Sequence, residues 1–136
     1  MRQSGHIAHA VTYRIDQVKR RIHTRCLGAV TLDEILQHFA DLVRDPDCPA
    51  RLDVLLDLSE MTSLPTRSKL TGVTTEIARV RPRVQFDGCA IIATQDALFG
   101  MARMFEVFAE NHFGATRVFR TVDEGTRWLE LEPAAR

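Results

Sequence analysis

Residues 52 to 58 read Leu-Asp-Val-Leu-Leu-Asp-Leu, a short and nearly continuous apolar run. Such a run predicts a strand that is covered on both faces, because a strand with one wet face alternates apolar and polar residues. Strands of this kind occur in parallel sheets that carry helices on their faces. We therefore expect residues 52–58 to form a central strand of an α/β fold.

A hairpin and a helix are predicted before this strand. Apolar residues alternate with polar ones between residues 11 and 26, which predicts a β-hairpin with one buried face and places Val18 and Arg20 on the apolar side of its second strand. The sequence Thr-Leu-Asp-Glu at 31–34 is typical of a capping box. It predicts the start of an amphipathic helix that ends before Pro46.

Strand and helix patterns alternate after the central strand. Residues 59–68 are rich in hydroxyl groups and predict a connection, followed by a helix that begins near Lys69 with Thr66 or Ser68 as its N-cap and ends at Pro82. The remaining pattern predicts a strand over 88–93, a helix over 96–112 that ends at Gly114 in a left-handed conformation, a strand over 116–120, and a helix after the capping box at 121–124.

These elements predict one α/β domain over residues 1–136. An N-terminal β-hairpin is followed by alternating helices and strands, which gives a five-stranded, mostly parallel sheet with about four helices. A chain of 136 residues is long enough to bury one core without disulfides or metals.

Composition excludes several classes of protein. The net charge is zero and 45% of the residues are hydrophobic, so we expect no nucleic acid partner. The charge lies in alternating basic and acidic segments along the chain. On the hairpin, basic residues form a stripe over 19–25, which we interpret as a solvated or helix-paired strand face rather than an anion site. Residues 1–10 lack the apolar run of a signal peptide and no segment is apolar enough to span a membrane, so we expect a cytoplasmic protein.

The motifs of common enzymes are missing from the sequence. It contains no phosphate-binding loop, no dinucleotide fingerprint, no nucleophile elbow and no zinc-protease helix, so we predict no catalytic residue, no metal and no cofactor. An odd number of widely spaced cysteines predicts reduced, buried thiols. We expect surface or helix-cap roles for the histidines at positions 38 and 112. The cysteines are Cys26, Cys48 and Cys89, and the five histidines are His6, His9, His23, His38 and His112.

Two carboxylates lie at predicted strand ends. Asp57 and Asp96 are compatible with a two-carboxylate site. We favour a structural interpretation, in which Asp57 accepts N–H groups of the following loop and Asp96 lies in the first turn of a helix.

The predicted third helix carries more apolar surface than one sheet face can cover. Its charged residues, Arg103, Glu106 and Glu110, form one narrow strip. The excess predicts a second contact surface, which is a neighbouring helix, a homodimer interface or an apolar ligand groove. The core stripe is Leu98, Met101, Phe105, Phe108 and Ala109, whereas Phe99, Met104 and Val107 fall outside it.

These patterns together resemble a known family. A hairpin, a buried strand that ends in Asp57-Leu58-Ser59, and a hydroxyl-rich loop before a helix resemble the STAS or SpoIIAA-like fold of anti-sigma factor antagonists. The stretch Phe-Gly-Met-Ala-Arg-Met-Phe at 99–105, followed by residues 117–121 and 123–129, is similar to the SpoIIAA-like branch, which is also described as STAS/SEC14-like.

The resemblance to the antagonists implies a phosphorylation switch. Their loop carries Asp-Ser-Ser-Gly, in which a partner kinase phosphorylates a serine, whereas this chain has Leu-Pro-Thr-Arg-Ser-Lys at 64–69. Thr66 and Ser68 are the nearest hydroxyl groups. Each is also explained as a helix cap.

The resemblance to the SpoIIAA-like branch implies a different function. It implies a non-enzymatic binding or regulatory domain that forms a homodimer, binds a regulatory protein or an apolar or lipid-like ligand between its second and third helices, and contacts membranes. Gly72 and Gly100 weaken these two helices. The basic segment 66–83 predicts a ligand with a negative end. The candidate ligand or interface residues are Leu70, Val73, Phe99, Arg103, Met104 and Val107.

Overall fold

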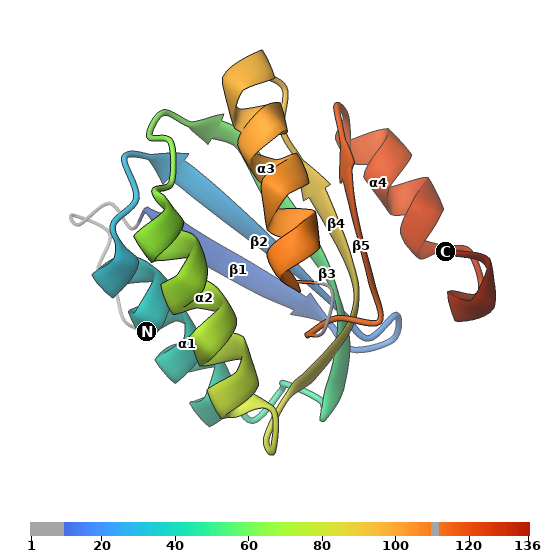
Figure 1. The fold of residues 1–136 in the computed structure, drawn as a ribbon. Coiled ribbons are helices and arrows are strands. Elements are labelled where there is room, and N and C mark those ends of the chain that lie inside the picture. Colours follow the sequence, from blue (N-terminus) through green and yellow to red (C-terminus); the bar gives the residue numbers. More distant parts are fainter. Residues whose placement is uncertain (1–9, 110–111) are drawn as a thin grey trace.

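The structure, a computed structural model, describes residues 10–109 and 112–136 (Figure 1). Its five strands form one sheet in the order β1-β2-β3-β4-β5, in which β1 and β2 are antiparallel and the other neighbours are parallel. This architecture confirms the predicted fold class. The elements are β1 (Val11–Asp16), β2 (Arg21–Gly28), α1 (Leu32–Arg44), β3 (Arg51–Met61), α2 (Arg67–Val80), β4 (Gln85–Ile92), α3 (Asp96–Ala109), β5 (Ala115–Phe119), α4 (Val122–Leu129) and a 3-10 turn (Pro133–Ala135).

Helices cover both faces of the sheet (Figure 1). Helices α1, α2 and α3 lie on one face, and α4 lies on the other, against β3, β4 and β5. Val54 and Leu58 belong to the larger core under α1–α3, whereas Leu55 packs with Trp128 of α4 in a smaller core. Both faces of β3 are therefore buried, which confirms the prediction that residues 52–58 form a central strand covered on both sides.

The hairpin differs from its prediction at the turn. Val18 and Arg20 were expected in the second strand, but residues 17–20 form the turn, Val18 is 95% exposed and Arg20 has a φ of 53°. The backbone N–H of Lys19 donates to Oδ1 of Asp16 and stabilises this turn. The alternation of apolar and polar residues continues through residues 17–20, although these residues form a turn and not a strand. The prediction that Val18 and Arg20 belong to the second strand was therefore wrong.

Several element boundaries also differ by one to three residues. Strand β3 runs on through Met61, because Gly28 of β2 pairs with it, so the predicted connection loses its first three residues. Helix α2 begins at Arg67 rather than near Lys69, and Thr66 is its N-cap, with its Oγ1 accepting the Lys69 N–H at 3.2 Å. Strand β4 begins at Gln85, three residues before its prediction.

The predicted left-handed glycine after α3 was wrong. Gly28 is the glycine with positive φ within the described residues, and Gly114 is not left-handed. A Cβ at Gly114 would instead lie 3.0 Å from the carbonyl oxygen of Asp87, so close backbone approach explains this glycine. His6, His9 and Glu110, which the sequence analysis considered, lie outside the described residues.

Candidate functional site

An apolar cavity of about 150 Å³ lies between the sheet and helices α1–α3, and it is partly open to solvent. Its walls come from all three helices and from the central strands. Ile22, Val54 and Ile91 line it from the sheet, Leu70 and Val73 from α2, and Met101, Ala102 and Phe105 from α3.

The packing of the helices explains this space. Gly72 lets α2 approach α1 so closely that a Cβ there would lie 3.0 Å from Cδ1 of Leu32. Helix α2 packs less extensively on α3 than on α1. Helix α3 presents the small side chains of Ala102 and Ala109 to the core. Because the alanine side chains of α3 are small and α2 packs less extensively on α3 than on α1, the space between these elements is not completely filled.

Polar groups gather at one end of the cavity. The hydroxyl of Ser63 accepts the backbone N–H of Val30 at 3.1 Å, and the ammonium of Lys69 donates to the Val30 carbonyl at 3.0 Å. Lys69 is half-buried, and within residues 10–109 and 112–136 no carboxylate lies within ion-pair distance of it. The end of the cavity therefore carries a positive charge that is satisfied by a neutral carbonyl.

His38 lines the same cavity from α1 and was missed as a site residue. Its ring packs edge-on against Tyr13, with centroids 5.2 Å apart, and its Nδ1 is buried without a hydrogen-bond partner in the described part of the chain. Burial lowers the pKa of His38 to about 4, so the ring is neutral near pH 7. The expected surface role holds only in part, because His38 is half-buried and Tyr13 covers one side of its ring. The sequence carried no pattern that marks a buried histidine here.

The structure separates the predicted ligand or interface residues into two groups. Leu70 and Val73 line the cavity, whereas Phe99, Arg103, Met104 and Val107 do not. Phe99 lies under the guanidinium of Arg120, which is 4.0 Å from the ring centroid. Arg103 lies 3.5 Å from the carboxylate of Glu106.

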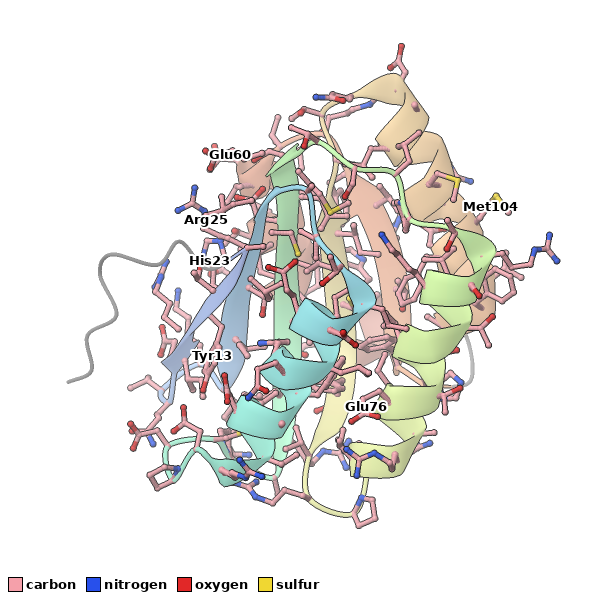
Figure 2. The ribbon with its side chains drawn as sticks, turned by 90° about the vertical axis from the view of Figure 1, so that its left-hand side faces the viewer. Tyr13, His23, Arg25, Glu60, Glu76 and Met104 are labelled. Carbon is pink, nitrogen blue, oxygen red and sulfur yellow. The ribbon has the colours of Figure 1, made fainter. Side chains whose placement is uncertain are left out.

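The outer surface of α3 is apolar. Val107 is 71% exposed and Met104 is 44% exposed, and Figure 2 shows Met104 on the outside of the helix. Phe108 was predicted in the core stripe but is also exposed. It follows Met104 by four residues and Met101 by seven, so the three side chains form one strip that begins at the cavity. Met104 and Phe108 of this strip are exposed, and helix α2 packs less extensively on α3 than on α1.

Comparison with solved structures identifies the architecture. An uncharacterised protein of the DUF3478 family with a SpoIIAA-like fold from Shewanella loihica PV-4 is 15% identical, with 88% of this chain and 92% of that chain covered at a TM-score of 0.60. An anti-sigma factor antagonist from Mycobacterium paratuberculosis is 12% identical, with 92% and 98% covered at a TM-score of 0.58. The chain has the SpoIIAA-like fold. No family model and no curated protein matches the sequence.

In this SpoIIAA-like fold, the hydroxyl groups of the loop before α2 lie at the helix start. Thr66 is the N-cap, and Ser68 is exposed in the first turn. Asp57 lies within β3 and accepts the N–H of Ser59, of the same strand, at 2.9 Å, so it bonds backbone of its own strand rather than of the following loop. Asp96 lies in the first turn of α3 as expected and pairs with Arg120 at 2.9 Å.

Part of the basic stripe of the hairpin is paired, and Figure 2 shows Arg25 and His23 on the sheet face opposite α1–α3. Arg25 forms an ion pair with Glu60, and Arg14 donates to Nδ1 of His23 at 3.1 Å. Burial and the neighbouring Arg14 lower the pKa of His23. Lys19 and Arg25 of the stripe are thus paired with Glu130 and Glu60, whereas Nε of Arg21 and Nε2 of His23 are buried without a hydrogen-bond partner in the described part of the chain.

Other sources of chemistry are limited. Within the two described ranges, no cluster of three histidine, cysteine or acidic side chains could hold a metal ion, and no helix is long and apolar enough to cross a bilayer. Cys26, Cys48 and Cys89 are free and buried, as predicted. Burial raises the pKa of Cys26 to about 12, which keeps its thiol protonated and unreactive at neutral pH.

Proposed function

We propose that this chain is a non-enzymatic binding domain whose cavity under α2 and α3 takes a small apolar ligand with an anionic end. The cavity carries the proposal. Its volume of about 150 Å³ equals that of an engineered protein cavity that stays dry and binds benzene-sized molecules. A ligand of this size fits without any change in the fold.

Lys69 supports an anionic end on this ligand. Its half-buried ammonium meets a neutral carbonyl, and Lys69 also lies in the first turn of α2, where the helix dipole favours negative charge. An anion there gains a charge-assisted hydrogen bond in a partly desolvated place. The ligand therefore lies with its tail among Leu70, Ala102 and Phe105 and its head at Lys69.

Longer amphiphiles need more room than the cavity offers. Parting of α2 and α3 would join the cavity to the exposed strip of Met101, Met104 and Phe108. The same strip would then shield a longer acyl chain from water or rest on a membrane surface, which is the finer part of the proposal.

Titration calorimetry with benzoate and with benzyl alcohol, which are close to benzene in size, tests the proposal. We expect both ligands to bind the wild type, Ala102→Leu to abolish binding of both by filling the cavity, and Ala97→Leu, on the exposed side of α3, to leave binding unchanged. Lys69→Met should weaken benzoate binding about tenfold, which corresponds to about 1.4 kcal/mol, and leave binding of benzyl alcohol unchanged. Equal binding to wild type and Ala102→Leu would overturn the proposed site.

A second candidate function is a phosphorylation-switched regulator that binds a partner kinase. Likeness to an anti-sigma factor antagonist supports it, together with the exposure of Thr66 and Ser68. A phosphate on Ser68 would lie at the start of α2 beside Arg67, where both the helix end and the guanidinium stabilise it. A phosphate on Thr66 would replace the cap that holds the Lys69 N–H.

Intact-mass measurement after expression in the native host tests this second function. We expect an added phosphate that maps to Ser63, Thr66 or Ser68. A protein that carries no phosphate at any growth stage would count against the switch, and it would leave the ligand proposal untouched.

A further inference from the structure

On the free edge of strand β5, one backbone N–H group donates a hydrogen bond to a side chain of helix α3. Strand β5 is last in the sheet order, so one side of it has no neighbouring strand. The carbonyl of Phe119 accepts the N–H of Ala93, which follows β4, so the backbone groups of Phe119 point toward β4. Groups on neighbouring residues of a strand point in opposite directions, and Val118 therefore points outward.

Glu106 of α3 accepts a hydrogen bond from this outward-facing N–H of Val118. Its Oε2 accepts the Val118 N–H at 2.9 Å, and its Oε1 lies 3.5 Å from Nε of Arg103. Of the predicted charged strip of α3, Glu106 thus contacts the β5 edge. An ionised carboxylate is a stronger acceptor than the neutral carbonyl that another strand would offer, so the edge is closed at this position.

The sequence of β5 is complementary to itself around the same amide. In an antiparallel pair of two β5 strands centred on Val118, each Val118 exchanges both backbone hydrogen bonds with the Val118 of the second copy. Arg117 of one copy then lies opposite Phe119 of the other, twice, which is a favourable cation–aromatic pair. Glu106 therefore holds the central donor of this pairing.

We propose that Glu106 is a gate on the β5 edge. While its carboxylate holds the Val118 amide, the edge is closed, and when Glu106 is withdrawn, two copies of the chain pair antiparallel through β5. Movement of α3 away from β5 opens the gate, because Glu106 moves with the helix. This inference is independent of the cavity and of its ligand.

Size-exclusion chromatography with light scattering tests the gate. Relative to wild type, we expect Glu106→Ala to double the mass as protein concentration rises, and Glu106→Gln, which keeps an acceptor oxygen, to stay at the wild-type mass. Arg103→Ala is the matched control, because it breaks the neighbouring ion pair and leaves Glu106 on Val118. Adding Val118→Pro to Glu106→Ala should restore the wild-type mass, because proline has no N–H to donate.

Hydrogen exchange at Val118 gives a second readout that survives a failure of any one variant. The amide should exchange slowly in wild type, at least tenfold faster in dilute Glu106→Ala, and slowly again in the doubled species. A Glu106→Ala protein that keeps the wild-type mass at all concentrations overturns the proposal. A doubled mass that persists with Val118→Pro overturns it as well, because association would then use another surface.

Discussion

Arg136 grips Asp53 through two parallel hydrogen bonds, of 2.8 Å from Nη1 to Oδ1 and 2.9 Å from Nη2 to Oδ2. The two side chains are only 6% and 15% exposed. Oδ1 of Asp53 also accepts the backbone N–H of Gly88 at 2.9 Å, and Arg136 donates to the carbonyls of Leu129 and Leu131. The pair thus ties the segment after α4 to the centre of the sheet.

Removing one partner of this pair should destabilise the protein. We expect Asp53→Ala to lower the free energy of unfolding by about 3 kcal/mol, at the low end for a broken buried pair because Arg136 keeps its two carbonyl acceptors. Urea unfolding measures the change. Lys19→Ala breaks the exposed pair with Glu130 and should cost less than about 1 kcal/mol. Equal effects in the two variants would contradict the structural role of Asp53.

Two helical glycines should respond to alanine in opposite ways. A Cβ at Gly125 of α4 would lie 2.6 Å from Cδ1 of Ile92, so Gly125→Ala should destabilise the protein by about 1–3 kcal/mol. A Cβ at Gly100 of α3 would meet nothing within 4 Å, so Gly100→Ala should stabilise it by about 0.5–1 kcal/mol through helix propensity. Thermal unfolding of both variants checks the signs. A destabilised Gly100→Ala protein would mean that the glycine is needed for packing or motion.

The half-buried His38 should make stability depend on pH. Because burial lowers its pKa from 6.5 to about 4, the unfolded chain binds more protons than the folded chain between these values. The free energy of unfolding should therefore fall as pH drops from about 6.5 toward 4, by at most about 1.4 kcal/mol per pH unit from this group. Denaturant unfolding from pH 7.5 to 4.5 should show a shallower slope in His38→Phe. An unchanged slope would assign the pH dependence to groups other than His38.

The exposed side chains of α3 provide a test of the predicted homodimer. Met104 and Val107 lie outside the cavity, so replacing both with lysine should leave the fold intact. If two copies meet through α3, light scattering should show half the wild-type mass for this double variant. Val18→Lys, in the exposed hairpin turn, is the control and should keep the wild-type mass. An unchanged mass in the double variant, together with lipid extracts that stay empty in both forms, would reject α3 as an interface and as a ligand surface.

The sequence predicted those parts of the fold that depend on neighbours along the chain. The capping boxes at 31–34 and 121–124 are both formed, because each needs two side chains only three residues apart. The apolar run at 52–58 predicted a strand buried on both faces, because the pattern itself records which faces are covered. The resemblance identified the fold as SpoIIAA-like, and the solved structures of that fold confirm it. The order of the strands in the sheet was not predicted and comes from the structure.

The candidate site could be predicted only in part. Helical spacing placed Leu70 and Val73 on the inner face of α2, where they line the cavity. The same reasoning predicted that Phe108 is buried, whereas it is exposed in the structure. Periodicity gives the direction of a side chain around its own helix but not the distance to the next helix.

The sequence by itself determined the order and type of the elements, the caps and the central buried strand, because hydrophobic period and local hydrogen bonds act over a few residues. Only the tertiary structure decided the cavity beside Ala102, the hydrogen bond between Val118 and Glu106, and the ion pair between Arg136 and Asp53. Each of these depends on how far apart two packed elements lie. That spacing follows from side-chain volumes on both elements at once, and no single segment of the chain records it.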